Sequence, residues 1–232
     1  MLKFNEEVLR TESIRETFLQ NGKCRIEEFW EKDSAKSLSS EISTLPYSLA
    51  YSLNGLNREA TDKDLAGLNV SQQRELLRSI HQEAAKGSGF LYGRFKISKQ
   101  STGLISDVLK LLNSESVLNF VREISGHTNI IAADAQVTRF APGNFLTRHS
   151  DDLAAEGRKL AYVFSFSEQW HPDWGGLLQF YHQSGEPTDT WRPHFNSLTL
   201  FDVKHIHAVT CVAPFAPQNR YSITGWFKSK GV

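Results

Sequence analysis

The chain has 232 residues, in which 26 Lys and Arg residues balance 26 Asp and Glu residues. Hydrophobic residues make up 40% and charged residues 22%, values that exclude disordered, collagen-like and coiled-coil proteins. The zero net charge argues against a nucleic-acid partner, because polynucleotide binding usually requires a net basic surface.

The length favours one domain, residues 1–232, with a single core. Cys24 and Cys211 form no Cys-x-x-Cys pair, so neither a disulfide framework nor a thiolate metal site is indicated. The first residues have no signal-peptide pattern, and no stretch approaches the roughly 20 apolar residues of a spanning helix. We therefore expect a cytoplasmic protein with no membrane partner.

The first half of the chain is predicted to be rich in helices, because its apolar residues recur with a period near 3.6. Asn69 and Gln72 form a capping pattern at the start of one of them. Short strands are expected at 25–30 and 89–97. The predicted helices cover 6–20, 35–45 and 70–86, with one or two more between Leu104 and Gly126.

After Gly126 the apolar period changes to 2, in short runs bounded by Pro, Gly, Asn and Asp. Seven short strands without helices between them favour an antiparallel sandwich or barrel such as a jelly roll. The predicted strands are 129–140, 145–151, 159–167, 177–182, 197–203, 206–212 and 219–227. The expected fold is mainly β, with a helix-rich cover (1–126) flanking a jelly-roll core (127–232).

Metal-ligand spacing appears in the segment RHSDD, where His149 and Asp151 share one face of a strand. His205 and His207 lie on a later predicted strand, and an antiparallel barrel can bring the two strands together. Two imidazoles and one carboxylate form the facial triad of non-haem iron(II), which leaves positions for substrate and dioxygen. Alternation does not choose between the two later histidines, because both fall on one face.

An arginine begins the predicted strand RYSITGWF at 220–227. One face of this strand is shared by Arg220, Ser222, Thr224 and Trp226. An arginine that points into a barrel is a buried charge and needs an anion, and the far carboxylate of a dicarboxylate cosubstrate would supply one.

Several segments between residues 140 and 227 resemble, in order, the iron(II) and 2-oxoglutarate-dependent oxygenases. The resemblance is greatest to the prolyl hydroxylases, both the hypoxia-sensing and the ribosomal types with their bacterial relatives. The matching segments are FAPGNFLTRHSDD, EGRKLAYVFSF, WGGLLQFY, NSLTLFDV, HAV and RYSITGWF. The resemblance implies a double-stranded β-helix (jelly roll) with Fe(II) bound by His149, Asp151 and His207. It also implies 2-oxoglutarate anchored by Arg220, dioxygen as the oxidant, and ascorbate dependence.

This sequence departs from the family at Ser165, where related prolyl hydroxylases have a tyrosine that contacts the far carboxylate of 2-oxoglutarate. A serine hydroxyl is shorter, and Thr224 and Tyr162 are further candidates for the contact, although alternation turns Tyr162 toward the outer face of its strand. Strand alternation turns Ser165 toward the barrel interior. The candidate residues that line the substrate site are Trp226, Asn144 and Arg148.

The resemblance implies hydroxylation of a prolyl residue of a protein or peptide, with release of succinate and CO2. Loops 52–70 and 140–148 are expected to form a rim for this extended substrate. Two alternatives keep the chemistry and change the substrate: a free amino acid or other metabolite, or an alkylated nucleic acid. The latter subfamily typically has a second arginine where this chain has Trp226. Two others are a cupin-like metalloenzyme without 2-oxoglutarate and a non-catalytic jelly-roll binding module.

Overall fold

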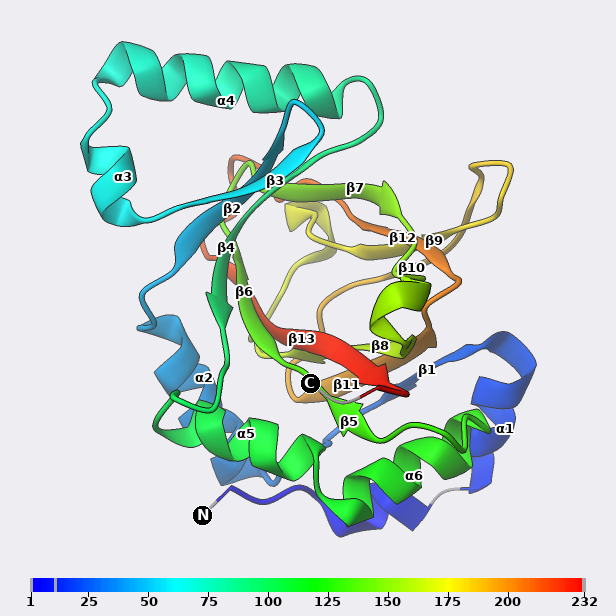
Figure 1. Ribbon diagram of the computed structural model, residues 1–232. Coiled ribbons are helices and arrows are strands. Elements are labelled where there is room, and N and C mark those ends of the chain that lie inside the picture. Colours follow the sequence, from blue (N-terminus) through cyan, green and yellow to red (C-terminus); the bar gives the residue numbers. More distant parts are fainter. Residues whose placement is uncertain (1, 11, 231–232) are drawn as a thin grey trace.

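A curled antiparallel sheet forms a jelly-roll-like half-barrel, as Figure 1 shows for the computed structural model, which describes residues 2–10 and 12–230. The helical elements are η1 (Glu6–Arg10), α1 (Glu12–Asn21), α2 (Lys32–Ser43), α3 (Asp62–Ala66), α4 (Val70–Ala84), α5 (Leu104–Leu112), α6 (Glu115–Ser125), η2 (Ala154–Glu156) and η3 (Pro172–Trp174). The strands are β1 (Lys23–Ile26), β2 (Ser48–Leu53), β3 (Leu56–Ala60), β4 (Phe90–Lys96), β5 (Ala132–Ala133), β6 (Gln136–Phe140), β7 (Phe145–His149), β8 (Arg158–Ser165), β9 (Leu178–Tyr181), β10 (Pro187–Trp191), β11 (Ser197–Asp202), β12 (Ile206–Val209) and β13 (Arg220–Lys228). The expected jelly roll with flanking helices is confirmed.

The strand order combines both halves of the chain in one sheet, β1-β11-β8-β13-β6-β4-β7-β12-β9-β10. β2 pairs with β4 and β3, and β5 pairs with β13. The strands at the two ends of this order approach each other, since Lys23 Nζ of β1 lies 3.1 Å from an Asp189 oxygen of β10. The helix-rich first half therefore contributes four strands to the sheet, including β4 between β6 and β7.

Four helices, α1, α2, α5 and α6, lie together beside β1, β11 and β13 in Figure 1. The outward residues of β8, including Tyr162 and Phe164, belong to one buried cluster with Leu38 of α2 and Val121 of α6. Ala161 and Val163 alternate with them and line a cavity inside the barrel. This strand therefore has an outer face that packs against the helices and an inner face that lines the cavity.

Asn196 ties the N-terminal segment to the sheet. Its φ of 59° lies in the left-handed region, which asparagine tolerates better than most residues. The side-chain carbonyl accepts a hydrogen bond from the Trp30 backbone N–H (2.9 Å), and the side-chain amide donates to the Trp30 carbonyl (2.7 Å). One buried side chain thus satisfies both backbone groups of Trp30.

Residues 52–70 differ from the expected loop. They contain the end of β2, all of β3 and α3, and Asn54 and Gly55 form the two-residue turn between the strands with φ values of 55° and 71°. Asn-Gly favours this type of two-residue hairpin turn, so the dipeptide in the sequence indicated a hairpin here. β3 was missed because four of its five residues are exposed and show no alternation.

Other element boundaries also differ in detail. The predicted helix 6–20 is a 3-10 turn followed by α1, and the predicted strand 129–140 is divided into β5 and β6. The predicted helix 70–86 is α4, and its capping pair forms reciprocal hydrogen bonds of 2.9 Å between Asn69 and Gln72. Within residues 2–10 and 12–230, none of the helices combines the length and apolarity that a membrane crossing requires.

Candidate metal centre and cosubstrate pocket

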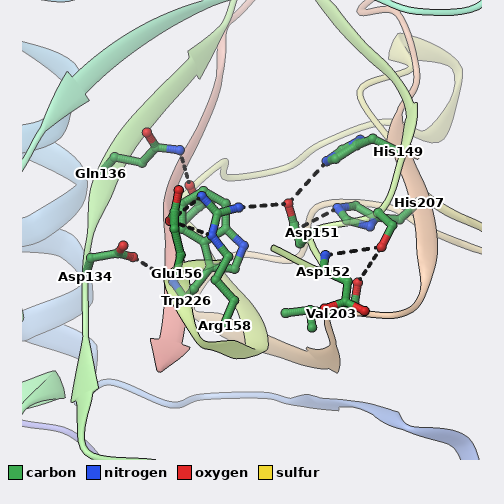
Figure 2. A network of polar contacts seen from close by, with 12 residues as sticks. Asp134, Gln136, His149, Asp151, Asp152, Glu156, Arg158, Val203, His207 and Trp226 are labelled. Carbon is green, nitrogen blue, oxygen red and sulfur yellow. Dashed lines mark hydrogen bonds and ion pairs between the residues drawn. The ribbon is translucent and has the colours of Figure 1, made fainter. Parts of the chain in front are cut away.

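His149, Asp151 and His207, hereafter the triad, meet inside the barrel. β7 and β12 are antiparallel neighbours, and His149 lies directly opposite His207 in their register. Asp151 follows the end of β7, and its oxygens lie 3.6 Å from His149 Nε2 and 3.5 Å from His207 Nε2 (Figure 2). The potential ligand atoms of the three residues all lie within 4.8 Å of one another.

Backbone carbonyls orient both imidazoles of the triad. His149 Nδ1 lies 2.9 Å from the Thr147 carbonyl, and His207 Nδ1 lies 3.0 Å from the His205 carbonyl. Because a carbonyl only accepts hydrogen bonds, each Nδ1 carries the proton and donates it. In the neutral form of each ring, Nε2 therefore keeps a free lone pair that faces the centre of the triad, the arrangement that metal-binding histidines adopt.

The electrostatics of the triad favour one carboxylate and at least one neutral imidazole. Burial first, and then the neighbouring His149, lower the pKa of His207 to about 4. Burial alone would lower the pKa of His149, but the hydrogen bond and charge of Asp151 outweigh it and raise that pKa. Burial also works against the Asp151 carboxylate, yet the two histidines hold its pKa below the ordinary value. Ionised carboxylate and neutral imidazole are the forms that bind metals.

His205 lies outside the triad. Its Nε2 points toward the connection between α1 and β1, where a Cβ on Gly22 would come within 2.7 Å, and its ring packs edge-on against Phe180. Strand alternation placed His205 and His207 on one face, which is wrong because His205 lies in the turn before β12 begins at Ile206. Its backbone carbonyl nevertheless orients His207.

A cavity of about 450 Å³ contains the triad. Of the other predicted site residues, Arg148, Thr224 and Trp226 line this cavity, and Ser165 is buried on the strand beside it. Asn144 is not among the residues that line it. Its side chain instead accepts a hydrogen bond from the Ala141 backbone N–H, which closes the 141–144 turn.

Arg220 also lines the cavity, and only 3% of its surface is exposed. Among the described residues it has no carboxylate within ion-pair distance, and its Nε has no hydrogen-bond partner. Burial lowers the pKa of Arg220 to about 10, and the charge of Arg25 contributes. A guanidinium still keeps its charge at that value, so the pocket presents a buried cation to an anionic ligand.

Two buried hydroxyl groups lie near this cation in the strand register. Ser222 is two residues beyond Arg220 and lies opposite Ser165 in the register of β13 and β8. Both hydroxyls are buried, and neither has a partner within the part of the chain that the structure describes. Thr224 accepts a hydrogen bond from Gln136 Nε2 at 3.4 Å. Tyr162 does not compensate for the serine, because its hydroxyl donates to the Asp134 carbonyl on the other face of β8.

The sequence analysis missed four residues that lie in or beside the cavity. Ser222 was placed on the face of Arg220 by alternation but was given no role in the site. Arg158 begins the segment RKLAYVFS and lines the cavity beside the triad. Tyr92 and Arg94 come from β4, and their approach to the triad depends on long-range strand pairing that no local pattern indicates.

Residues 135–228 match the family model of the 2OG-Fe(II) oxygenase superfamily. This segment contains the triad and Arg220, and the family implies Fe(II), 2-oxoglutarate and dioxygen. A 126-residue region, 51% of the chain, is 28% identical to prolyl 3-hydroxylase OGFOD1 of Mus musculus. The match covers 23% of that protein, so the chain spans only a minor part of this curated relative.

Solved structures share the fold across most of the chain. A Pseudomonas putida prolyl-4-hydroxylase has a TM-score of 0.65 at 17% identity, covering 94% of this chain and 98% of its own. A Trichoplax adhaerens prolyl hydroxylase, solved with a hypoxia-inducible-factor peptide, has a TM-score of 0.61 at 16% identity, with 97% and 91% covered. The α-ketoglutarate-dependent epimerase SnoN scores 0.60 at 11% identity, with 97% and 82% covered. The fold therefore hosts more than one reaction.

Proposed function

We propose that the protein is an Fe(II)- and 2-oxoglutarate-dependent dioxygenase of the prolyl hydroxylase type, because residues 135–228 match the family model of the 2OG-Fe(II) oxygenase superfamily and the similar proteins include prolyl hydroxylases. Its reaction is hydroxylation of a prolyl residue in a protein or peptide, with release of succinate and CO2. The observation that carries the proposal is the combination, in one cavity, of the triad with the buried, unpaired cation of Arg220.

The triad fits Fe(II). His149 and His207 each have a free Nε2, and Asp151 is ionised, so three ligands of the right chemistry converge from one side. When bound, iron with 2-oxoglutarate supplies the oxidising power for dioxygen chemistry that no side chain possesses. The protein holds the ligands before the metal arrives, because the backbone already orients both imidazoles.

The pocket around Arg220 fits the far carboxylate of 2-oxoglutarate. A guanidinium can donate two parallel hydrogen bonds to a carboxylate, and the orphaned hydroxyls of Ser165 and Ser222 can donate two more. Two serines thus take the place of the tyrosine that related enzymes use. Binding at this end orients the cosubstrate toward the triad, which lies in the same cavity.

The lining of the cavity supports a polypeptide substrate. Gly55 of the β2–β3 turn, Phe90, Arg148 and Leu153 line the cavity and come from four separate segments. A site built from several separate segments suits an extended chain, whereas a free amino acid needs a small closed pocket. Trp226 offers an apolar surface beside the triad against which a proline ring can pack.

Labelled dioxygen provides the direct test. The purified protein would be incubated with Fe(II), 2-oxoglutarate and proline-containing peptides, including peptides from ribosomal proteins. Each reaction would be run with and without ascorbate. We expect succinate and a peptide that has gained one labelled oxygen atom on proline, and loss of both in Asp151→Ala. Oxygen incorporation into free proline but into none of the peptides would refute the polypeptide substrate. A lack of 2-oxoglutarate turnover under every condition would refute the enzyme.

A further inference from the structure

Arg158 lies between the triad and a set of ion pairs at the far end of β13 (Figure 2). Its guanidinium lies 3.4 Å from the centre of the Trp226 ring, and Nη1 is 3.7 Å from Asp151 Oδ1. Only 12% of the Arg158 side chain is exposed. Asp151 has no other cationic partner than this arginine and the two histidines of the triad in the described chain.

Glu156 fixes the other edge of the guanidinium. Arg158 Nε donates to Glu156 Oε2 at 3.0 Å, and Nη2 lies 2.9 Å from the same oxygen. With Nε and Nη2 engaged by Glu156, Nη1 is the nitrogen directed at Asp151. The planar fork of arginine makes this division possible, because its nitrogens hold fixed directions.

Lys228 and Asp134 close the set of contacts into a ring. Lys228 Nζ lies 3.5 Å from Glu156 Oε2 and also pairs with Asp134 Oδ2. Asp134 Oδ1 accepts a hydrogen bond of 2.9 Å from the backbone N–H of Trp226, whose ring stacks on Arg158. Each neighbour of Arg158 is therefore itself held in place.

We propose that Arg158 is a positioning residue for the carboxylate of Asp151. By holding Oδ1, it keeps the carboxylate in the orientation in which one oxygen faces His149 and the other faces His207. This inference rests on the proposed function, since it concerns how the triad binds a metal. Contacts that orient a metal ligand typically change metal affinity by about 10–100-fold when they are removed.

Charge and orientation act on metal affinity in opposite directions. The positive charge of Arg158 repels a divalent cation, so its removal alone would tighten metal binding. Loss of orientation would weaken it, because the freed carboxylate must be ordered on binding. Arg158→Lys keeps the charge but lacks the fork, whereas Arg158→Gln removes both.

Mn(II) binding to the protein without 2-oxoglutarate, followed by electron paramagnetic resonance, separates these two effects. We expect both Arg158→Lys and Arg158→Gln to bind Mn(II) about tenfold more weakly than the unmodified protein. Arg139→Gln is the matched control, because Arg139 also stacks on an aromatic ring, that of Tyr47 at 4.7 Å, but neither lines the cavity nor pairs with Asp151. Its Mn(II) affinity should not change. Unchanged affinity in Arg158→Lys with tighter binding in Arg158→Gln would overturn the inference.

Glu156→Gln keeps the inference testable if the Arg158 variants do not fold, because the Glu156 side chain is 45% exposed and does not touch the triad. We expect Glu156→Gln to weaken Mn(II) binding and to add nothing to the effect of Arg158→Lys in the double variant. Full additivity, or wild-type affinity in Glu156→Gln, would overturn the inference. If the unmodified protein binds no Mn(II), the proposed function fails instead.

Discussion

Arg220 carries the electrostatic part of the cosubstrate pocket, since it is a buried cation whose guanidinium faces the cavity. Loss of a charge-assisted contact to a carboxylate costs about 2–5 kcal/mol in an enclosed site. Arg220→Ala should therefore raise the 2-oxoglutarate concentration required for turnover well over tenfold while Mn(II) binding persists. Steady-state kinetics and Mn(II) titration measure the two effects.

Arg148→Ala provides the comparison for Arg220→Ala, because Arg148 lines the same cavity but its side chain lies against Tyr181 and the Gly185 carbonyl. The 2-oxoglutarate requirement should stay unchanged in this variant. If Arg220→Ala and the unmodified protein require the same 2-oxoglutarate concentration, Arg220 does not bind the cosubstrate.

The buried thiol of Cys24 makes the free energy of unfolding decrease at alkaline pH. Burial raises the pKa of its thiol from 9.0 to about 12, so the folded protein keeps a proton that the unfolded chain loses first. The stabilisation from this thiol is complete below about pH 9 and is lost as the pH rises toward 12, at up to ~1.4 kcal/mol per pH unit. Urea unfolding at about pH 8 and pH 10 should show a smaller loss of stability in Cys24→Ala. Identical losses in both proteins would contradict this account.

At the residue scale, the sequence predicted the chemistry better than the geometry. Strand alternation correctly turned Arg220, Thr224 and Trp226 to one face. It failed for His205 because a turn, which has no alternation, replaces the predicted strand there. Asn144 illustrates the same limit, since a side chain that completes a turn looks in the sequence like one free to bind substrate.

At the scale of elements, Asn196 connects the N-terminal segment to β11 through its hydrogen bonds to the Trp30 backbone. Asn196→Ala would leave the buried Trp30 N–H and carbonyl without partners and would place alanine at a left-handed φ. We expect a loss of about 2–4 kcal/mol in the free energy of unfolding, measured by urea denaturation. Asn196→Gly tolerates the φ and should lose about 1 kcal/mol less. A loss below about 0.5 kcal/mol in Asn196→Ala would show that these hydrogen bonds contribute little.

Elements with strong local signals were predictable. The capping pair of α4 and the alternating strands of the second half appear at nearly their predicted positions. β3 and β10 were not predicted, because short, exposed strands with polar residues lack an apolar period. For β3, the Asn54-Gly55 dipeptide indicated a hairpin turn between β2 and β3. This turn preference outweighs the weak β propensity of the residues that follow.

At the scale of the whole molecule, the sheet contains strands from both sides of residue 126, where we predicted the boundary between the helix-rich cover and the jelly-roll core. β4 lies between β6 and β7, and β1 extends the sheet beyond β11. The helical cover also buries the outer face of β8. Pairing between strands so distant in sequence leaves no trace in local patterns, which is why the division suggested by composition was too sharp.

The fragment 127–232 should therefore not fold alone, although it contains the whole segment that matches the family model. Without residues 1–126, β6 and β7 lose the strand between them, and Tyr162 and Phe164 lose their cover. We expect the fragment to aggregate or to bind a hydrophobic dye, as measured by size-exclusion chromatography and dye fluorescence. Co-expression with 1–126 should restore a soluble complex. A monomeric, cooperatively unfolding fragment would instead show that the second half is an independent unit.

The hydrogen bonds between Trp30 and Asn196 can form only late in the synthesis of the chain. Trp30 and Asn196 are 166 residues apart, so at about 5–20 residues per second the ribosome makes the second partner roughly 10–30 s after the first. During that interval β1 has an unpaired edge, the kind of surface on which nascent chains associate with one another. We therefore expect the yield of native protein in cells to depend on translation rate and growth temperature, even for variants whose equilibrium stability is unchanged.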